Sequence, residues 1–316
     1  MNGIYLQIKG TGSYLPDQVL TNRALEAMVD TSDEWITDRT GIKERRLCGD
    51  TKVYEMAARA ATAAMTDAGI TANEIDAIIA ATITPDCYTP SLSCLVQKEL
   101  GADGAFCFDV NAACSGFTYA LDVADSYIKA GKAKTVLIVA SEAISRITDY
   151  TDRNTCVLFG DGAGAVVACA SDTPGMIDCC LGASGAAGEV LRASAFAEDR
   201  CVKMNGKEVY KFAVNVNIKV INELLTRSGL AIGDVSRVVP HQANKRIISA
   251  VASKLDYDAD RIFTNLEKYG NTSSASIPIC LDEMNKGGLL RDGDKIILVG
   301  FGGGLTYGGA LITWRR

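Results

Sequence analysis

Three side chains of this sequence have the chemical types needed to attack a carbonyl carbon and to stabilise the charge that develops on it: Cys114, His241 and Asn271. His241 is the single histidine among 316 residues, and it follows the apolar run 238–240. The ends of such strands are where α/β sheets place their ligands, so an acid/base or hydrogen-bonding role is one interpretation of His241. The other is a polar residue satisfied at the start of a helix.

Cys114 has the sequence context of an activated nucleophile. The segment AFCFDV (105–110) is typical of a strand and 115–130 of a helix, so the thiol lies at a strand-to-helix turn. The positive end of the helix dipole and free backbone N–H groups stabilise a thiolate there, and later an oxyanion. The chain has 11 cysteines, and most free cysteines are buried apolar residues. Cys94 and Cys107 fall inside a predicted helix and a predicted strand, so Cys114 is the candidate.

An internal repeat relates the two halves of the chain at a constant offset of 160 residues. MTDAGI (65–70) matches LTRSGL (225–230), and TVLIVA (135–140) matches KIILVG (295–300). Beyond these strands the offset falls to 145, which predicts an extra loop in the first half between about 142 and 161. The same offset pairs Cys114 with Ser274. It also places Asn271, in NTSSAS (271–276), at the second strand-to-helix turn, although alone that stretch resembles a routine helix cap.

The repeat predicts an α/β fold made of two similar halves, residues 1–173 and 174–316, with a boundary at the turn-rich segment 172–175. Near-continuous Val, Ile and Leu strands predict mostly parallel sheets with helices on both faces. A pseudo-twofold axis between the halves would bring Cys114, His241 and Asn271 to one cavity. The run FGGGLTYGG (301–309) precedes a final strand, unlike a dinucleotide-binding motif, and its backbone could approach a ligand closely.

Composition excludes several other classes of protein. A net charge of −6 and a pI near 5.0 argue against nucleic acid and against an anionic membrane as partners. No apolar run approaches the roughly 20 residues of a membrane span, and the N-terminal segment does not resemble a targeting leader. The cysteines include no C-x-x-C pair, which disfavours a zinc clip or a disulfide framework. We therefore expect a cytoplasmic protein.

Several motifs in order resemble the β-ketoacyl-[acyl-carrier-protein] synthase III family. They are NAACSGF (111–117), HQAN (241–244), GNTS (270–273), FGGG (301–304), TSDEWI (31–36) and RTGI (39–42). The resemblance extends from about Gly10 to the C-terminus. It implies a thiolase-like five-layered αβαβα fold, usually a homodimer, and a catalytic triad of Cys114, His241 and Asn271. Related elongating synthases use two histidines and thiolases a second cysteine near the C-terminus, and this chain has neither.

The resemblance implies a decarboxylative Claisen condensation that initiates fatty-acid synthesis. The Cys114 thiolate would take the acyl group of an acyl-CoA primer, acetyl-CoA or a longer or branched one, while the N–H groups of Cys114 and Gly303 hold the oxyanion. Malonyl-ACP, that is malonate carried on acyl carrier protein, would then lose CO₂. Neutral His241 and Asn271 would hold the enolate that attacks the acyl-enzyme. No metal or redox cofactor is implied.

The resemblance also implies three sets of contact residues. They are Trp35, Arg39, Arg153 and Asn244 for CoA; Lys211, Arg246 and Lys254 for docking of acyl carrier protein; and Tyr88 and Thr89 for the primer pocket. Stacking of a cation on an aromatic ring suits the adenine site, although Arg153 could simply be solvated, as could the basic cluster. Family members often carry a bulky residue near position 89. The small Thr89 would admit primers longer than acetyl unless Tyr88 fills the space.

Three alternative functions stay open at this point. A specialised synthase of polyketide, quinolone or alkyl-ketone biosynthesis would keep the same triad. A cysteine peptidase could also use Cys, His and Asn, but it gives no reason for the repeat. A catalytically silent module would bind acyl-CoA without becoming acylated at Cys114.

Overall fold

Two β-sheets lie face to face in the computed structural model, which describes residues 3–195 and 198–315. The first sheet has the strand order β1-β7-β6-β4-β5, and the second has the order β11-β12-β13-β8. The strands of the first sheet are β1 (Tyr5–Tyr14), β7 (Asp161–Ser171), β6 (Thr135–Ala143), β4 (Ala77–Ala81) and β5 (Phe106–Val110). Those of the second are β11 (Arg237–Pro240), β12 (Lys295–Gly302), β13 (Thr306–Thr313) and β8 (Met176–Ala183).

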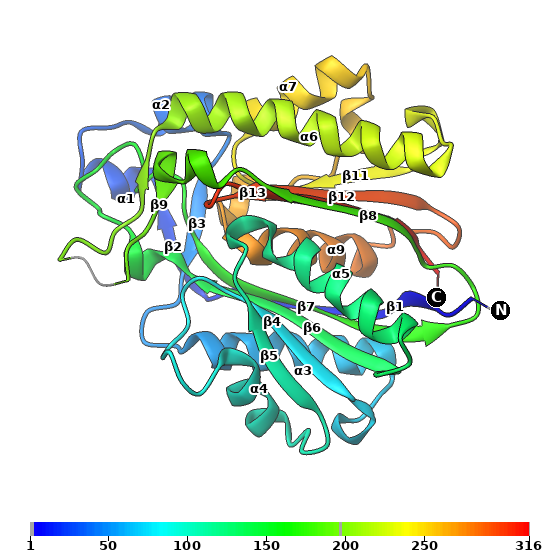
Figure 1. Cartoon of the computed structure of the whole chain (residues 1–316). Coiled ribbons are helices and arrows are strands. Elements are labelled where there is room, and N and C mark those ends of the chain that lie inside the picture. Colours follow the sequence, from blue (N-terminus) through cyan, green and yellow to red (C-terminus); the bar gives the residue numbers. More distant parts are fainter. Residues whose placement is uncertain (1–2, 196–197, 316) are drawn as a thin grey trace.

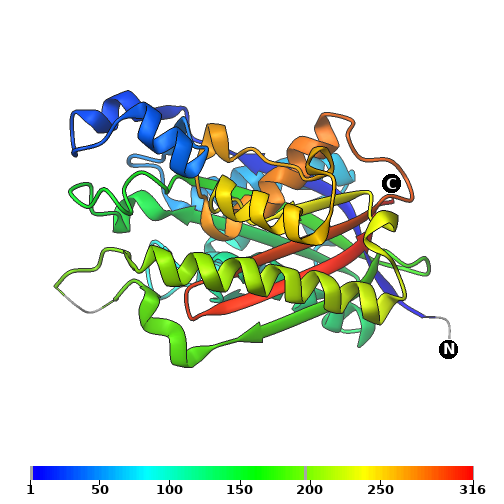
Figure 2. The same ribbon diagram turned by 90° about the horizontal axis from the view of Figure 1, so that it is seen from above.

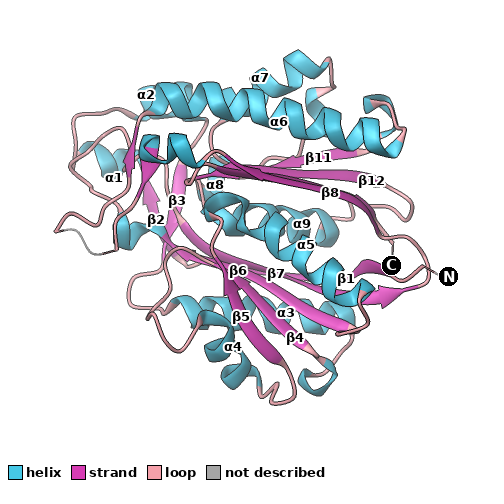
Figure 3. Cartoon of the chain, viewed as in Figure 1, coloured by secondary structure: helices cyan, strands magenta, loops and turns pink. Residues whose placement is uncertain are grey.

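Helices form three layers around these sheets (Figures 1 and 3). The layers are α3 (Val53–Ala68) and α4 (Leu92–Leu100) outside the first sheet; α5 (Gly116–Lys129) and α9 (Ser276–Lys286) between the sheets; and α6 (Gly206–Ser228) and α7 (Lys245–Leu255) outside the second. Seen from above, α6 runs along the second sheet (Figure 2). The five-layered αβαβα fold predicted from the sequence is therefore confirmed.

The middle layer is apolar because both of its faces are covered. Phe117, Ala120, Leu121 and Ala124 of α5 have no exposed surface, and neither have Ile277 and Leu281 of α9. These side chains belong to one cluster with residues of both sheets. Burial of this kind contributes about 1.5–3 kcal/mol for each large apolar side chain, so the middle layer holds the two halves together.

The sheets are mixed, and the expectation that they are mostly parallel is too strong. Parallel pairs are β4–β5, β4–β6 and β11–β12, whereas β1–β7, β6–β7, β12–β13 and β13–β8 are antiparallel. Parallel neighbours need a crossover connection, usually a helix, which α4 and α5 supply in the first half. The last strand of each half instead returns directly beside the preceding one, and this produces the antiparallel ladders.

The offset of 160 residues recurs in the positions of the elements. The short 3₁₀ turn Ala113–Ser115 and helix α5 correspond to the turn Ser273–Ala275 and helix α9, which start at Gly116 and Ser276. The extra loop predicted for the first half is confirmed. A long connection that includes the 3₁₀ turn Ile144–Ile147 joins β6 to β7, whereas residues 303–305 alone join β12 to β13.

The smaller elements surround one end of the sheets. They are β2 (Gln18–Thr21), α1 (Asn22–Glu26), α2 (Asp33–Thr40), β3 (Glu44–Leu47), β9 (Leu191–Arg192), β10 (Lys203–Met204) and α8 (Leu266–Tyr269). Among the helices of the described residues, none has both the length and the apolar character needed to cross a membrane.

Candidate active site

A cavity of about 1780 Å³ collects most of the residues singled out in the sequence. Those that line it are Cys114, His241, Asn271, Gly303, Trp35, Arg39, Asn244, Arg246 and Tyr88. Four others, Arg153, Thr89, Lys211 and Lys254, are not part of its lining in the described parts of the chain. The predicted meeting of residues from both halves at one cavity is thus what the fold produces.

Cys114 occupies the turn between β5 and α5, one residue after Ala113, whose φ is 45°. The thiol is buried, with 9% of the residue exposed. Burial raises the pKa of Cys114 to about 12, while the Ser273 hydroxyl and the backbone N–H of Cys114 itself favour the thiolate and lower it. Helix α5 begins at Gly116, so the positive end of its dipole also favours negative charge at this position.

Strand β12 ends directly against the nucleophile turn, and glycine permits that approach. A Cβ atom on Gly302 would overlap the backbone N of Cys114 and would lie 3.0 Å from the Cβ of Ala113. The Thr306 hydroxyl lies 2.7 Å from the carbonyl oxygen of Ala112 and 3.0 Å from that of Gly303. The loop that contains Gly303 is therefore fastened to the turn that contains Cys114.

His241 lies just after β11, with its side chain enclosed. Its backbone N–H donates to Val299 O at 2.7 Å, and its Nδ1 is 2.7 Å from the Oγ of Ser276. The ring of Phe301 packs edge-on with centroids 5.6 Å apart. Burial lowers the pKa of His241 to about 3, so the imidazole is neutral at physiological pH. Of the two interpretations left open for His241, this placement favours the functional one.

Asn271 is held on both sides of its backbone by the connection that precedes β7. Its N–H donates to Leu158 O at 2.8 Å, and its carbonyl oxygen accepts from Gly160 N at 3.0 Å. Its side-chain Oδ1 accepts the N–H of Ser273 at 2.8 Å. Because Oδ1 is occupied in this way, the NH₂ group of Asn271 is the donor left for a ligand in the cavity.

Sequence reasoning missed three residues beside the candidate triad: Ser273, Ser276 and Glu142. The two serines lie in the NTSSAS segment, and the 160-residue offset already aligned them with Ala113 and Gly116. Glu142 gave a weaker signal, an acidic residue at the end of the apolar run TVLIVA. It has no exposed surface and accepts hydrogen bonds from the hydroxyls of both Ser273 and Ser274.

Aromatic and cationic side chains meet near the cavity mouth. The Arg153 guanidinium carbon lies 4.3 Å from the ring centroid of Trp35, and that of Arg39 lies 6.0 Å from it. Arg153 comes from the long β6–β7 connection and also approaches Asp30 at 3.7 Å. The pairing of Trp35 with Arg153 expected from the sequence is present. The alternative of a merely solvated Arg153 does not describe this contact.

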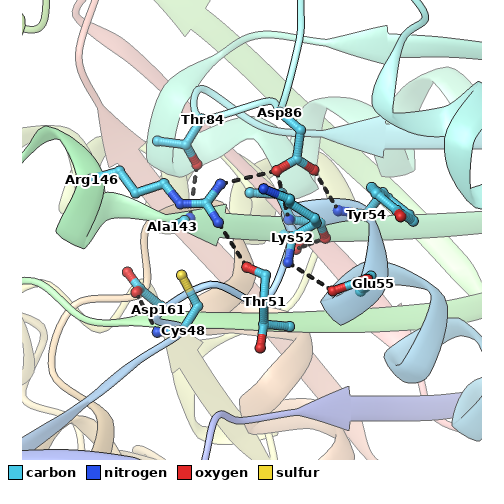
Figure 4. A network of polar contacts seen from close by, with 12 residues as sticks. Cys48, Thr51, Lys52, Tyr54, Glu55, Thr84, Asp86, Ala143, Arg146 and Asp161 are labelled. Carbon is cyan, nitrogen blue, oxygen red and sulfur yellow. Dashed lines mark hydrogen bonds and ion pairs between the residues drawn. The ribbon is translucent and has the colours of Figure 1, made fainter.

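The segment with Tyr88 and Thr89 is anchored at its base by Asp86 (Figure 4). The Asp86 carboxylate accepts two backbone N–H groups at the start of α3, those of Val53 at 3.1 Å and Tyr54 at 3.0 Å. The Arg146 guanidinium adds a third bond, at 3.0 Å. Beyond this anchor Tyr88 is 72% exposed and Thr89 is also exposed.

The three basic residues expected to form one patch lie in different places. Arg246 lies at the rim of the main cavity, with its guanidinium carbon 5.8 Å from the ring centroid of Tyr210. Lys211 instead lines a second cavity of about 550 Å³ beside α6, and Lys254 is exposed near the end of α7. Arg246 is the member of the set that lies closest to the candidate active site in terms of the cavity lining.

Two family models match this chain. The model of 3-oxoacyl-[acyl-carrier-protein (ACP)] synthase III matches residues 108–185, and the model of its C-terminal part matches residues 225–314. The β-ketoacyl-[acyl-carrier-protein] synthase III of Clostridium acetobutylicum is 49% identical over the full length of both chains.

Solved structures agree with these matches. The 3-oxoacyl-[acyl-carrier-protein] synthase III of Aquifex aeolicus is 49% identical, with a TM-score of 0.95 over 98% of this chain and 100% of that one. A priming β-ketosynthase of the R1128 polyketide pathway is 37% identical, with a TM-score of 0.94 over 98% of this chain and 97% of that one. Such relationships leave no support for a cysteine peptidase. The chain belongs to the β-ketoacyl-[acyl-carrier-protein] synthase III family of condensing acyltransferases, which have the thiolase fold.

Proposed function

We propose that this protein transfers the acyl group of an acyl-CoA to Cys114 and condenses it with malonyl-ACP, with loss of CO₂. The observation that carries the proposal is that Cys114, His241 and Asn271 line one cavity and come from both halves of the chain. The family membership supplies the reaction class. The residue roles below are proposals built on the geometry.

The first half-reaction uses the turn at Cys114. The thiolate attacks the thioester carbon, and the electron pair of the carbonyl moves onto its oxygen. The N–H groups of Cys114 and Gly303 hold that oxyanion, because the loop with Gly303 is tied to the same turn through Thr306. Collapse of this intermediate expels the CoA thiolate and leaves an acyl group on Cys114.

The second half-reaction uses two neutral donors. Decarboxylation of the malonyl group leaves an enolate, whose oxygen is stabilised by the Nε2–H of His241 and the NH₂ of Asn271. Ser276 supports this role, since its oxygen accepts the Gln242 N–H at 3.4 Å and its own proton can be donated to Nδ1 of His241. A neutral imidazole with the proton on Nε2 is the tautomer that can donate to the enolate.

Binding surfaces follow from the same cavity. Trp35 with Arg39 and Arg153 would hold the CoA adenine and phosphates at the mouth, with Asn244 further along the lining. Arg246, Lys211 and Lys254 would contact the acidic carrier protein. Tyr88 and Thr89 would bound the primer pocket. No metal or redox cofactor takes part in the proposed chemistry.

A homodimer in the cytoplasm is the proposed state of this protein, with residues 1–173 and 174–316 as copies of one ancestral unit. Strand β5 is the last strand of its sheet, and Phe106 on it is 39% exposed. Phe106 also stacks on Phe108, with ring centroids 6.4 Å apart. A strand with a free edge and exposed aromatic side chains can pair with a second copy.

A specialised synthase is the second candidate, because the polyketide priming enzyme is 37% identical over nearly the whole chain. Thr89, where family members often carry a bulky residue, also leaves room for a longer primer. Assays of condensation with malonyl-ACP and with malonyl-CoA separate the two candidates. A strong preference for malonyl-CoA would contradict the fatty-acid assignment.

The main test is intact-mass spectrometry after incubation with acyl-CoA species of different length. Native protein should gain the mass of one acyl group, and Cys114→Ala should gain none. The preferred acyl length reports the primer. Binding of acyl-CoA without a gain of mass on the native protein would instead indicate the catalytically silent module.

A further inference from the structure

Glu142 is a buried carboxylate for which the proposed mechanism has no use. It lies near the end of β6 and has no exposed surface. Its five hydrogen bonds in the described structure all come from neutral donors. The donors to Oε2 are the Thr82 hydroxyl, the Ile83 N–H and the Thr84 hydroxyl, and those to Oε1 are the hydroxyls of Ser273 and Ser274. A buried charge without a cation beside it is costly, so a use for Glu142 has to be sought.

Ser273 lies between Glu142 and the nucleophile. Its hydroxyl is 3.1 Å from Oε1 of Glu142, and it also forms a hydrogen bond with the side chain of Cys114. The backbone of Ser273 is fixed, because its N–H donates to Oδ1 of Asn271 and its φ is 52°. One hydroxyl therefore bridges a thiol and a carboxylate.

The nucleophile needs such a partner. A thiol whose pKa is raised to about 12 by burial is almost entirely protonated at neutral pH. The helix dipole and the oxyanion-hole N–H groups stabilise a thiolate once it exists, but neither accepts a proton. His241 is a poor acceptor in this place, because burial lowers its pKa to about 3. Burial raises the pKa of Glu142, which brings it closer to that of the thiol.

We propose that Glu142 accepts the proton of Cys114 through the hydroxyl of Ser273. The S–H bond breaks and its proton binds Oγ of Ser273, while the Ser273 hydroxyl proton passes to Oε1 of Glu142. The sulfur keeps the electron pair. When the product leaves, the thiolate that is released takes a proton back by the reverse path. This inference rests on the proposed role of Cys114 as nucleophile.

The charge of the buried group explains why this transfer is feasible. Before transfer the pair holds one negative charge on Glu142, and after transfer it holds one on Cys114. No second charge is created in the cavity wall, and no charge has to be brought in from solvent. Loss of the thiol proton to water would instead place two negative charges close together in a medium that stabilises neither.

Two other titratable groups lie near the elements that surround this pair. Asp161 begins β7 and pairs in register with Ala143, next to Glu142, but its carboxylate is held by Cys48 N and by Ser145. His241 lies across the cavity wall and is neutral. Within the described residues, neither is hydrogen-bonded to Cys114 or Glu142, so the relay is expected to titrate without them.

The test is the pH dependence of alkylation of Cys114 by iodoacetamide, followed by peptide mass spectrometry between pH 7 and 9. In the native protein the rate constant should change less than about twofold, because internal transfer forms the thiolate without release of a proton to solvent. Glu142→Gln and Ser273→Ala remove the acceptor and the bridge. In both, the rate constant should rise about tenfold for each pH unit, since the thiolate then forms only by loss of a proton to water.

Ser274→Ala is the matched control, because Ser274 bonds the same carboxylate oxygen at 2.7 Å but is not the bridge to Cys114. It should keep the flat profile. A tenfold rise for each pH unit in the native protein, or a flat profile in Ser273→Ala, would overturn the relay. If Glu142→Gln does not fold, as judged by circular dichroism, the two serine variants decide the question. Iodoacetamide needs neither acyl-CoA nor carrier protein, so this result is independent of the acylation test of the proposed function.

Discussion

Ala113 and Ser273 both have left-handed backbone conformations, with φ of 45° and 52°, and they occupy equivalent places in the two halves of the chain. Each begins the short turn that leads into a middle-layer helix, α5 or α9. Such conformations are unfavourable for residues other than glycine. Their occurrence at both turns shows that the two halves present side chains to the cavity by the same local geometry.

The first prediction concerns the approach of β12 to this turn. Gly302→Ala should lower kcat by at least about tenfold, because the new methyl group would displace the backbone of Cys114 and misalign the oxyanion hole. Overpacking should also destabilise the fold by about 1–3 kcal/mol. Steady-state kinetics and urea unfolding measure the two effects. Gly233→Ala is the control, since a Cβ there meets nothing within 4 Å, and equal kinetics in the two variants would contradict the prediction.

A second prediction separates the two half-reactions. Asn271→Ala should keep acylation of Cys114 and lose decarboxylation of malonyl-ACP by about 10²–10³-fold, as expected when one donor to an oxyanion is removed. Intact mass reports acylation, and release of labelled CO₂ reports decarboxylation. Equal loss of both steps would show that the assigned role of Asn271 is wrong.

The neutral state of His241 leads to a prediction about stability. The folded pKa of about 3 lies below the unfolded value of 6.5, so the unfolded chain binds a proton first as the pH falls. Folding stability should therefore be intact above pH 6.5 and decline below it, by about 2 kcal/mol at pH 5. Urea unfolding at pH 7 and pH 5 measures the loss. His241→Asn should lose about 2 kcal/mol less than the native protein over the same interval, and an unchanged difference would count against a buried neutral imidazole.

The contact between Trp35 and Arg153 predicts a defect in CoA binding. Arg153→Ala should raise KM for acyl-CoA about threefold to tenfold and leave kcat within twofold, because a stacked cation near a ring contributes about 0.5–2 kcal/mol. Trp314 is buried, so a Trp314→Phe background lets Trp35 fluorescence report CoA titrations. Arg291→Ala, at a residue outside the cavity lining, serves as the control. A fall in kcat with unchanged KM would refute the assignment.

The separate positions of the basic residues predict unequal effects on carrier docking. Arg246→Glu should raise KM for malonyl-ACP at least tenfold and leave KM for acyl-CoA within about threefold, with stronger effects at low salt. Lys254→Glu and Lys211→Glu should have smaller effects, because both lie outside the main cavity. Steady-state kinetics at two ionic strengths provides the measurement. If Lys211→Glu has the largest effect, the carrier docks beside the second cavity instead.

Much of this arrangement could be predicted because the repeat is local in sequence and regular in space. The turn around Cys114, the equivalent turn after Asn271 and the long β6–β7 connection all follow from strand and helix patterns combined with one offset. The balance of parallel and antiparallel pairs was wrong, since strand direction depends on the route of each connection rather than on apolar content. Glu142 and Ser276 were missed because their partners are distant in the chain. No periodicity marks a contact between a β6 carboxylate and a turn some 130 residues away.

The connection that precedes the last strand of each half has diverged in length while keeping its place in the fold. In the second half it is the three-residue glycine-rich segment beside the reacting carbon, and in the first half it is the long excursion that brings Arg153 to the entrance. Recognition and bond-making are thereby assigned to different copies of one structural position. Lengthening or recomposing the first-half excursion could retune which thioesters are admitted while the reaction centre stays untouched.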